Sequence, residues 1–141
     1  MSKIRVEELS IGYWVQDKNG KYAQILGIEN WSDGYVLNVR INGVDVGCVP
    51  ASSAHPIPIT PEILETNGWR NDGMYAILRI DEYLYLEYYY HEHRLRKWYC
   101  GIDEWANHAK VNDITFQAHC YSVHQLQHAL RLAGVNKEIT L

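Results

Sequence analysis

The stretch YVLNVRINGVDVGCV, residues 35–49, decides how the first half of this chain folds. Apolar residues recur at every second position of its first half, a period of two that indicates a β-strand; they are Tyr35, Leu37, Val39 and Ile41. Asn42-Gly43 then supplies the residue pair that favours a tight hairpin turn at positive φ. The segment from Val44 to Val49 is therefore predicted to return as the second strand of a hairpin.

The residues before this stretch repeat the same pattern. Strands are predicted over 11–16 and 22–28, joined by a turn that ends in Asn19-Gly20, and another turn follows at 30–34. Residues 4–9 could form one helical turn or a short strand. Short strands at this spacing predict a small, strongly bent β-barrel over residues 1–59, and an SH3-like barrel is the preferred interpretation.

All four prolines lie between residues 50 and 61 and mark the one visible boundary in the chain. Proline cannot donate to a β-ladder, so 55–59 is predicted to be an edge strand or an extended linker. Thr60-Pro61-Glu62 then has the composition of a helix start, with an N-cap threonine and a proline at the first helical position. Asn67-Gly68 is a typical helix end.

The second half is predicted to be an α+β unit over residues 60–141. Strands are predicted over 74–80, 83–90, 95–102 and 114–120, the last with Ile114, Phe116, Ala118 and Cys120 facing inward. Residues 103–110 fit either a short helix or a loop. A helix begins at Ser122, where Gln125 completes a capping box, and stops at Gly134; residues 137–141 could add a final strand. The predicted fold class is therefore α+β, a barrel followed by an antiparallel sheet with the C-terminal helix packed across it.

Composition limits the classes of function. The formal net charge of the 141-residue chain is −4, which does not favour a general nucleic-acid binder, although a local basic patch is compatible with it. The three cysteines form no C-x-x-C pair, residues 1–10 lack the apolar core of a signal peptide, and no apolar run approaches 18 residues. These features predict a cytoplasmic protein with reduced thiols, no contact with a membrane and no cofactor.

The aromatic content is unusual, with eleven Tyr and five Trp against one Phe. Trp14, Tyr22, Trp31 and Tyr35 lie around the first two hairpins, where aromatic side chains of SH3-like barrels line a groove for a peptide, a modified side chain or a base. The alternative is that they form the core and rim of the barrel. Tyr83 and Tyr85 would share one face of a later strand, which is either a binding surface or a face covered by the N-terminal half.

The densest basic segment runs from His91 to Tyr99. Basic and aromatic side chains interleaved in this way can bind single-stranded nucleic acid by phosphate contact and stacking; the candidates are Arg94, Arg96, Lys97, Trp98 and Tyr99. The simpler interpretation is a polar hairpin end followed by a half-buried strand.

Histidines of the last helix are the remaining candidates. His124, His128 and Arg131 fall on the side of the helix away from its apolar stripe, and His119 lies just before it. A solvated polar face is the favoured interpretation; an anion- or partner-contacting patch and a zinc site are the alternatives. Gln125 replaces the glutamate that the H-E-x-x-H motif requires. No catalytic set is predicted, and no residues are assigned to a metal.

Three stretches resemble a family of uncharacterised small proteins from prophages and mobile elements of gut Bacteroidales. They are Glu8-Leu9-Ser10-Ile11-Gly12, Pro58-Ile59-Thr60-Pro61-Glu62-Ile63-Leu64 and Val123-His124-Gln125-Leu126-Gln127-His128-Ala129-Leu130. Tyr13 departs from the family, which has Asn at that position. The resemblance implies an accessory gene of a phage or mobile element that acts in the cytoplasm of a bacterial host, and it implies no activity, cofactor or catalytic residue.

The sequence thus leads to three hypotheses. The first is a non-enzymatic binding module for a host protein or a small ligand. The second is a nucleic-acid-binding protein that uses residues 94–99. The third is a metal-dependent enzyme that uses His124 and His128.

Overall fold

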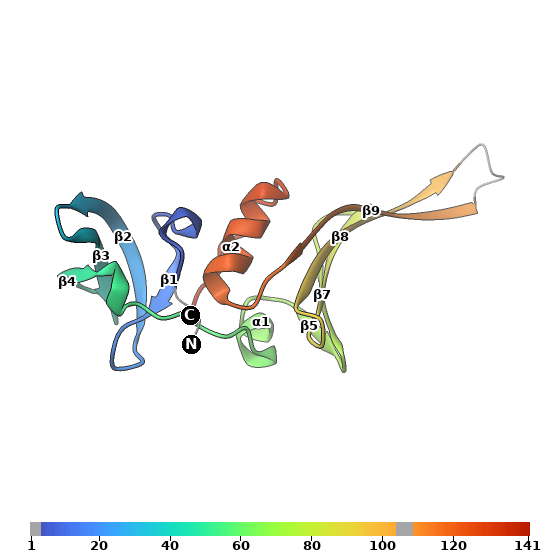
Figure 1. The fold of residues 1–141 in the computed structure, drawn as a ribbon. Helices are drawn as coiled ribbons and strands as arrows, with labels where there is room; N and C mark the ends of the chain where they lie inside the picture. Colours follow the sequence, from blue (N-terminus) through green and yellow to red (C-terminus); the bar gives the residue numbers. More distant parts are fainter. Residues whose placement is uncertain (1–3, 104–108) are drawn as a thin grey trace. The chain divides into compact units, whose positions relative to one another are not determined.

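The computed structural model describes residues 4–103 and 109–141, and they form two antiparallel sheets with two α-helices (Figure 1). The first sheet has four strands in the order β1-β2-β3-β4, and the second has five in the order β5-β6-β7-β8-β9. The strands are β1 Trp14–Gln16, β2 Tyr22–Trp31, β3 Gly34–Ile41, β4 Val44–Pro50, β5 Arg70–Asp72, β6 Tyr75–Arg79, β7 Leu84–Tyr89, β8 Arg94–Asp103 and β9 Ala109–His119. The helices are α1 Pro61–Thr66 and α2 Val123–Leu132, with short 3-10 turns η1 Val6–Glu8 and η2 Ala51–Ser53. The α+β class is confirmed.

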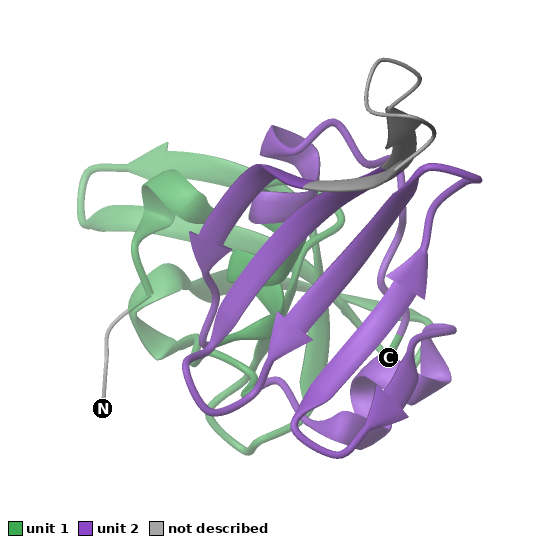
Figure 2. Cartoon of the chain, turned by 90° about the vertical axis from the view of Figure 1, so that its right-hand side faces the viewer, with its two compact units in different colours: residues 1–58, 122–128, 141 green, residues 59–121, 129–140 purple. Residues whose placement is uncertain are grey.

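The chain divides into two compact units (Figure 2). Unit 1 comprises residues 1–58, 122–128 and 141, and unit 2 comprises residues 59–121 and 129–140. Helix α2 therefore contributes its first turns to unit 1 and its last turn to unit 2.

The hairpin at residues 35–49 forms as predicted. Asn42 and Gly43 have φ values of 52° and 77°, the left-handed conformation that a tight hairpin turn needs, and Ile41 pairs with Val44 across it. Leu37 and Val39 are fully buried in the core of unit 1, together with Val15, Ala23 and Ile25 of the neighbouring strands. Alternation along the strands therefore sets which side chains form this core.

The first sheet is open. Within residues 4–103 and 109–141, β4 pairs with β3 on one side and no strand pairs with its other edge, so the predicted barrel is not closed. Bulges interrupt the register between Ile25 and Gly27 and between Val39 and Arg40, and such bulges increase the local twist of a sheet. The SH3-like assignment stays a prediction.

The proline-rich segment is extended, and α1 follows it. His55 pairs with Gln16 and Pro58 with Ser122 through isolated bridges. The Thr60 hydroxyl accepts a hydrogen bond from the Ile63 N–H at 3.2 Å, which confirms the predicted helix cap. Neither of the two α-helices in the described ranges is long and apolar enough to cross a membrane.

In unit 2, successive side chains along each strand again alternate between the two faces of the sheet, and one of these faces is buried. Leu86, Tyr88 and Leu95 are fully buried, and the Lys97 ammonium, on the same face as Leu95, donates to the Ala133 carbonyl at 2.8 Å. The last turn of α2 therefore lies over this face of the sheet. The predicted inward position of Ile114 is wrong: a bulge in the β8–β9 pairing leaves Ile114 opposite Trp98, and its side chain is 44% exposed.

Two predictions about the rest of unit 2 have different outcomes. The C-terminal segment 137–141 forms no strand; instead the Asn67 side chain donates to the Thr140 carbonyl at 2.9 Å and accepts from its N–H at 2.7 Å. The helix or loop predicted over 103–110 falls mostly on residues 104–108, which lie outside the described residues.

Candidate binding site

A groove of about 880 Å³ opens at one end of the four-stranded sheet in unit 1. Its walls come from η1, the β2–β3 turn, the start of β3, the end of β4 and η2. Most of the lining is apolar, and it comprises Ile4, Val6, Trp31, Asp33, Gly34, Tyr35, Val36, Cys48, Val49, Pro50, Ala51, Ser52, Ala54 and His55. Its volume falls within the usual range for ligand sites in proteins.

Two aromatic side chains stand at the open side of this groove. Trp31 is 54% exposed and Tyr35 is 46% exposed, so both present a large apolar surface to solvent. Trp31 pairs with Gly34 at the hairpin end, and Gly34 has a φ of 122°, a conformation that favours glycine. The Trp31 indole N–H donates to the Glu29 carboxylate at 3.2 Å, which orients the ring. The hairpin turn therefore holds two aromatic anchors at the groove.

The groove has few polar groups, and residues outside its lining form hydrogen bonds with two of the residues that carry them. The Cys48 thiol, exposed on β4, donates to the Asn38 side-chain oxygen at 3.0 Å. The backbone of His55 exchanges two hydrogen bonds with Gln16, at 2.8 and 2.9 Å, which fixes the far wall. Asp33 supplies the acidic group of the lining. The polar side chains of the lining are those of Asp33, Cys48, Ser52 and His55.

The edge strand β4 continues from this groove. Six of its seven residues are exposed, from Val44 to Cys48 and at Pro50, with Val44 61% and Val46 50% exposed. An exposed edge presents unpaired backbone N–H and C=O groups to a further strand. Cys48, Val49 and Pro50, the last residues of β4, also line the groove.

The structure places only part of the predicted aromatic set at the groove. Trp31 and Tyr35 line it, but Trp14 does not: this residue is half-buried on β1, and its backbone N–H donates to the Gln127 side chain at 2.9 Å. Tyr22, 41% exposed, also lies outside the groove. Sequence reasoning missed the walls formed by η1 and η2, because their small and aliphatic residues carry no local signal of a binding site.

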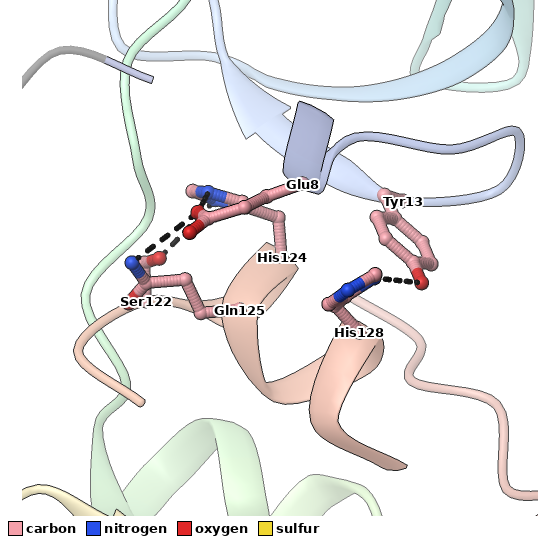
Figure 3. A network of polar contacts seen from close by, with 6 residues as sticks. All are labelled: Glu8, Tyr13, Ser122, His124, Gln125 and His128. Carbon is pink, nitrogen blue, oxygen red and sulfur yellow. Dashed lines mark hydrogen bonds and ion pairs between the residues drawn. The ribbon is translucent and has the colours of Figure 1, made fainter. Parts of the chain in front are cut away.

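His124 corrects the prediction of a solvated helix face. Its side chain is 2% exposed, with Nδ1 3.1 Å from the Ser122 hydroxyl and Nε2 3.6 Å from the Glu8 carboxylate (Figure 3). Gln125 donates to the same carboxylate at 3.5 Å. Glu8 of η1 therefore covers this side of α2. Helical periodicity alone cannot reveal such a neighbour.

This environment changes the protonation of His124. Burial lowers the pKa of His124 below its ordinary value, the nearby Glu8 carboxylate opposes that effect, and His128 adds to it. The imidazole is therefore held in its neutral form more strongly than a solvated histidine. Ser122, at one end of this serine–histidine–glutamate chain, is also buried, with an exposed fraction of 3%.

The other histidine candidates have different surroundings. The His128 Nδ1 lies 3.4 Å from the Tyr13 hydroxyl (Figure 3), whereas Arg131 is exposed and belongs to unit 2, as does His119. The predicted cluster of His124, His128 and Arg131 is thus divided between a buried network and an exposed cation. Across the described residues, no group of three or more His, Cys, Asp or Glu side chains is placed to hold a metal ion.

The basic–aromatic segment of β8 is also divided, between the two faces of its sheet. Arg94, Arg96 and Trp98 alternate on the face away from α2, where Trp98 pairs with Tyr85. Lys97 lies on the opposite face, with its ammonium on the Ala133 carbonyl. Tyr83, 47% exposed, stacks with Tyr99 at a ring separation of 6.1 Å.

Comparison with known protein families, with curated proteins and with solved structures found no match for this chain.

Proposed function

We propose that this chain is a non-enzymatic binding protein that captures an extended, apolar segment of a partner protein in the groove of unit 1. The observation that carries the proposal is the pair of half-exposed rings, Trp31 and Tyr35, in an 880 Å³ groove next to the open edge of β4. The resemblance to proteins of prophages and mobile elements supports a host protein as partner and the bacterial cytoplasm as location.

The open edge of β4 supports recognition by strand addition. An extended peptide that pairs with an exposed edge gains affinity from main-chain hydrogen bonds, and pockets for alternate side chains supply the specificity. Val44 to Cys48 are all exposed on β4, and the groove lining includes the end of this strand, from Cys48 to Pro50. A peptide lying along β4 would therefore place its last side chains near the end of the groove that Val49 and Pro50 line.

The charges near the groove indicate the composition of that peptide. Asp33 is part of the lining, and Glu29 lies beside Trp31. Carboxylates at the rim of an apolar site favour basic side chains on the partner. We therefore expect an aromatic or branched aliphatic anchor flanked by Lys or Arg.

One further observation supports binding rather than catalysis, and another supports a barrel-like fold for unit 1. The chain of Ser122, His124 and Glu8 is enclosed, so its hydroxyl is not presented to a substrate. The bulged four-stranded meander of unit 1 supports the interpretation of an SH3-like architecture.

The test is selection from a random peptide library, followed by titration of the selected peptides by calorimetry. Trp31→Ala and Tyr35→Ala are each expected to weaken binding at least tenfold, as aromatic anchors of binding sites do. Tyr22→Ala is the matched control, because Tyr22 is an exposed aromatic on the same sheet outside the groove. Equal loss in all three variants, or selected peptides that bind Trp31→Ala unchanged, would overturn the proposal.

A further inference from the structure

The second face of the five-stranded sheet, which we call the stacking face, carries aromatic and basic side chains in cross-strand rows. Register places Tyr75, Tyr89 and Arg94 side by side in one row, and Arg79, Tyr85 and Trp98 in another. Ile77, Glu87 and Arg96 form the row between them. Because residues directly opposite on paired strands point to the same face, these side chains share one surface.

Within each of the two outer rows, the two aromatic rings are nearly parallel to each other. Tyr75 and Tyr89 are stacked at a centroid distance of 4.9 Å with an interplanar angle of 22°. Tyr85 and Trp98 lie 6.2 Å apart with an angle of 9°. All four rings keep partial exposure, so their outer faces can receive a further planar group.

The arginines give this face a local charge opposite to that of the whole chain. Arg70, Arg79, Arg94 and Arg96 occupy it by register, against Asp72 and Glu87 and with Glu92 beside Arg94. Arg94 lies 3.3 Å from Glu92, and Arg96 lies 3.9 Å from Glu87. Both guanidinium groups remain partly exposed, and each carries five N–H donors, so an ion pair leaves donors for another anion.

Two polar atoms in the same rows lack a protein partner. The Nε of Arg96 and the indole nitrogen of Trp98 are buried and make no hydrogen bond within the described residues.

We propose that the stacking face binds single-stranded nucleic acid, with bases on the Tyr75–Tyr89 and Tyr85–Trp98 rows and phosphates on Arg79, Arg94 and Arg96. The two rows are four residues apart along β7, a separation of about 13 Å at the usual rise of a strand. Flat aromatic platforms bind unstacked bases without sequence preference, and a duplex would hide the base faces that they need.

This inference is independent of the proposed function, since the groove belongs to unit 1 and the stacking face to unit 2. It also differs from the hypothesis of nucleic-acid binding by residues 94–99. Lys97 does not belong to the stacking face, whereas Tyr75, Tyr85 and Tyr89 do.

The test is fluorescence anisotropy of the full chain with fluorescein-labelled 15-mers of oligouridylate and oligodeoxythymidylate, and with a labelled 15-base-pair duplex. We expect the single strands to bind more tightly than the duplex, with quenching of tryptophan emission. About three phosphate contacts predict a slope of about −2 for log affinity against log salt. Binding of the duplex with equal affinity, or no binding of any oligonucleotide at 50 mM salt, would overturn the proposal.

Paired variants separate stacking from general charge effects. Tyr85→Leu and Tyr89→Leu are each expected to weaken binding about fivefold or more, and Tyr22→Leu on the other sheet is the matched control. Arg79→Gln with Arg94→Gln is expected to flatten the salt slope, whereas Lys18→Gln with Lys21→Gln removes the same charge from the first hairpin and should leave it unchanged. Circular dichroism verifies that each variant is folded. Equal loss in target and control pairs would show non-specific attraction and would refute the site.

Discussion

His124 and Glu8, from opposite ends of the chain, meet in unit 1 with the imidazole Nε2 3.6 Å from the carboxylate (Figure 3). The other ring nitrogen, Nδ1, lies 3.1 Å from the Ser122 hydroxyl. This contact ties the first turns of α2 to η1 and makes the stability of unit 1 depend on the charge of one buried histidine.

Lowering the pH is expected to destabilise the protein through His124. In the unfolded chain this imidazole takes up a proton near pH 6.5, but burial lowers its pKa in the folded state. Between these two pKa values the unfolded state binds more protons, so the free energy of unfolding falls as the pH falls below about 6.5. Urea denaturation from pH 8 to pH 5 measures this slope.

The matched variant for this effect is His124→Gln, which cannot take up a proton. Its free energy of unfolding should fall less steeply below pH 6.5 than that of the wild type, because other ionisable groups are common to both. Parallel curves for the two proteins would show that His124 does not control the acid limb.

Lys97→Met is expected to destabilise the fold without affecting oligonucleotide binding. The variant keeps the aliphatic stem but removes the ammonium that donates to the Ala133 carbonyl at the end of α2. The expected loss is about 0.5–1.5 kcal/mol in the free energy of unfolding, measured by urea denaturation. Lys21→Met, at an exposed position in the first hairpin, serves as control and should change stability little. A Lys97→Met protein that loses oligonucleotide binding while folded would contradict the assignment of Lys97 to the helix side.

Asn67→Ala should release the C-terminal segment from unit 2. Asn67 is 7% exposed and holds both backbone groups of Thr140, and its amide also donates to the Ile63 carbonyl at 2.8 Å. Loss of these bonds should lower the free energy of unfolding by about 1–3 kcal/mol. Hydrogen exchange should show faster exchange at Thr140 than in the exposed-site control Asn136→Ala. Unchanged exchange at Thr140 would show that other contacts hold this segment.

The three thiols are expected to react with a maleimide in the order of their exposure. Cys48 is exposed in the groove, Cys100 is half-buried and Cys120 is fully buried. Mass spectrometry of partially labelled protein should therefore find the first label on Cys48.

Labelling at Cys48 also reports on the groove. A bulky maleimide on Cys48 should block a peptide selected for that site, while Cys48→Ser treated with the same reagent should still bind it. Peptide binding that survives full labelling of Cys48 would place the peptide elsewhere.

Local sequence signals determined the elements of this protein. Asn42-Gly43 set a hairpin by its backbone preference, Thr60-Pro61 set a helix start, and a period of two located most strands. These features depend on a few neighbouring residues, so they can be read without knowing what packs against them. Trp31 and Tyr35 were named as candidates from their place beside the predicted hairpins, and both line the groove.

Tertiary structure alone decided which faces are covered and which distant segments meet. Helical phase placed His124 away from the apolar stripe, but Glu8 and Ser122 enclose it, and one bulge moved Ile114 from the inner face to the outer one. The groove is lined by both η1 and η2, which lie more than forty residues apart in the sequence. Lys97 contacts the end of α2 and does not share a face of the sheet with Arg96 and Trp98. Burial and coordination depend on contacts between segments remote in the chain, and periodicity within one segment carries no information about its partner.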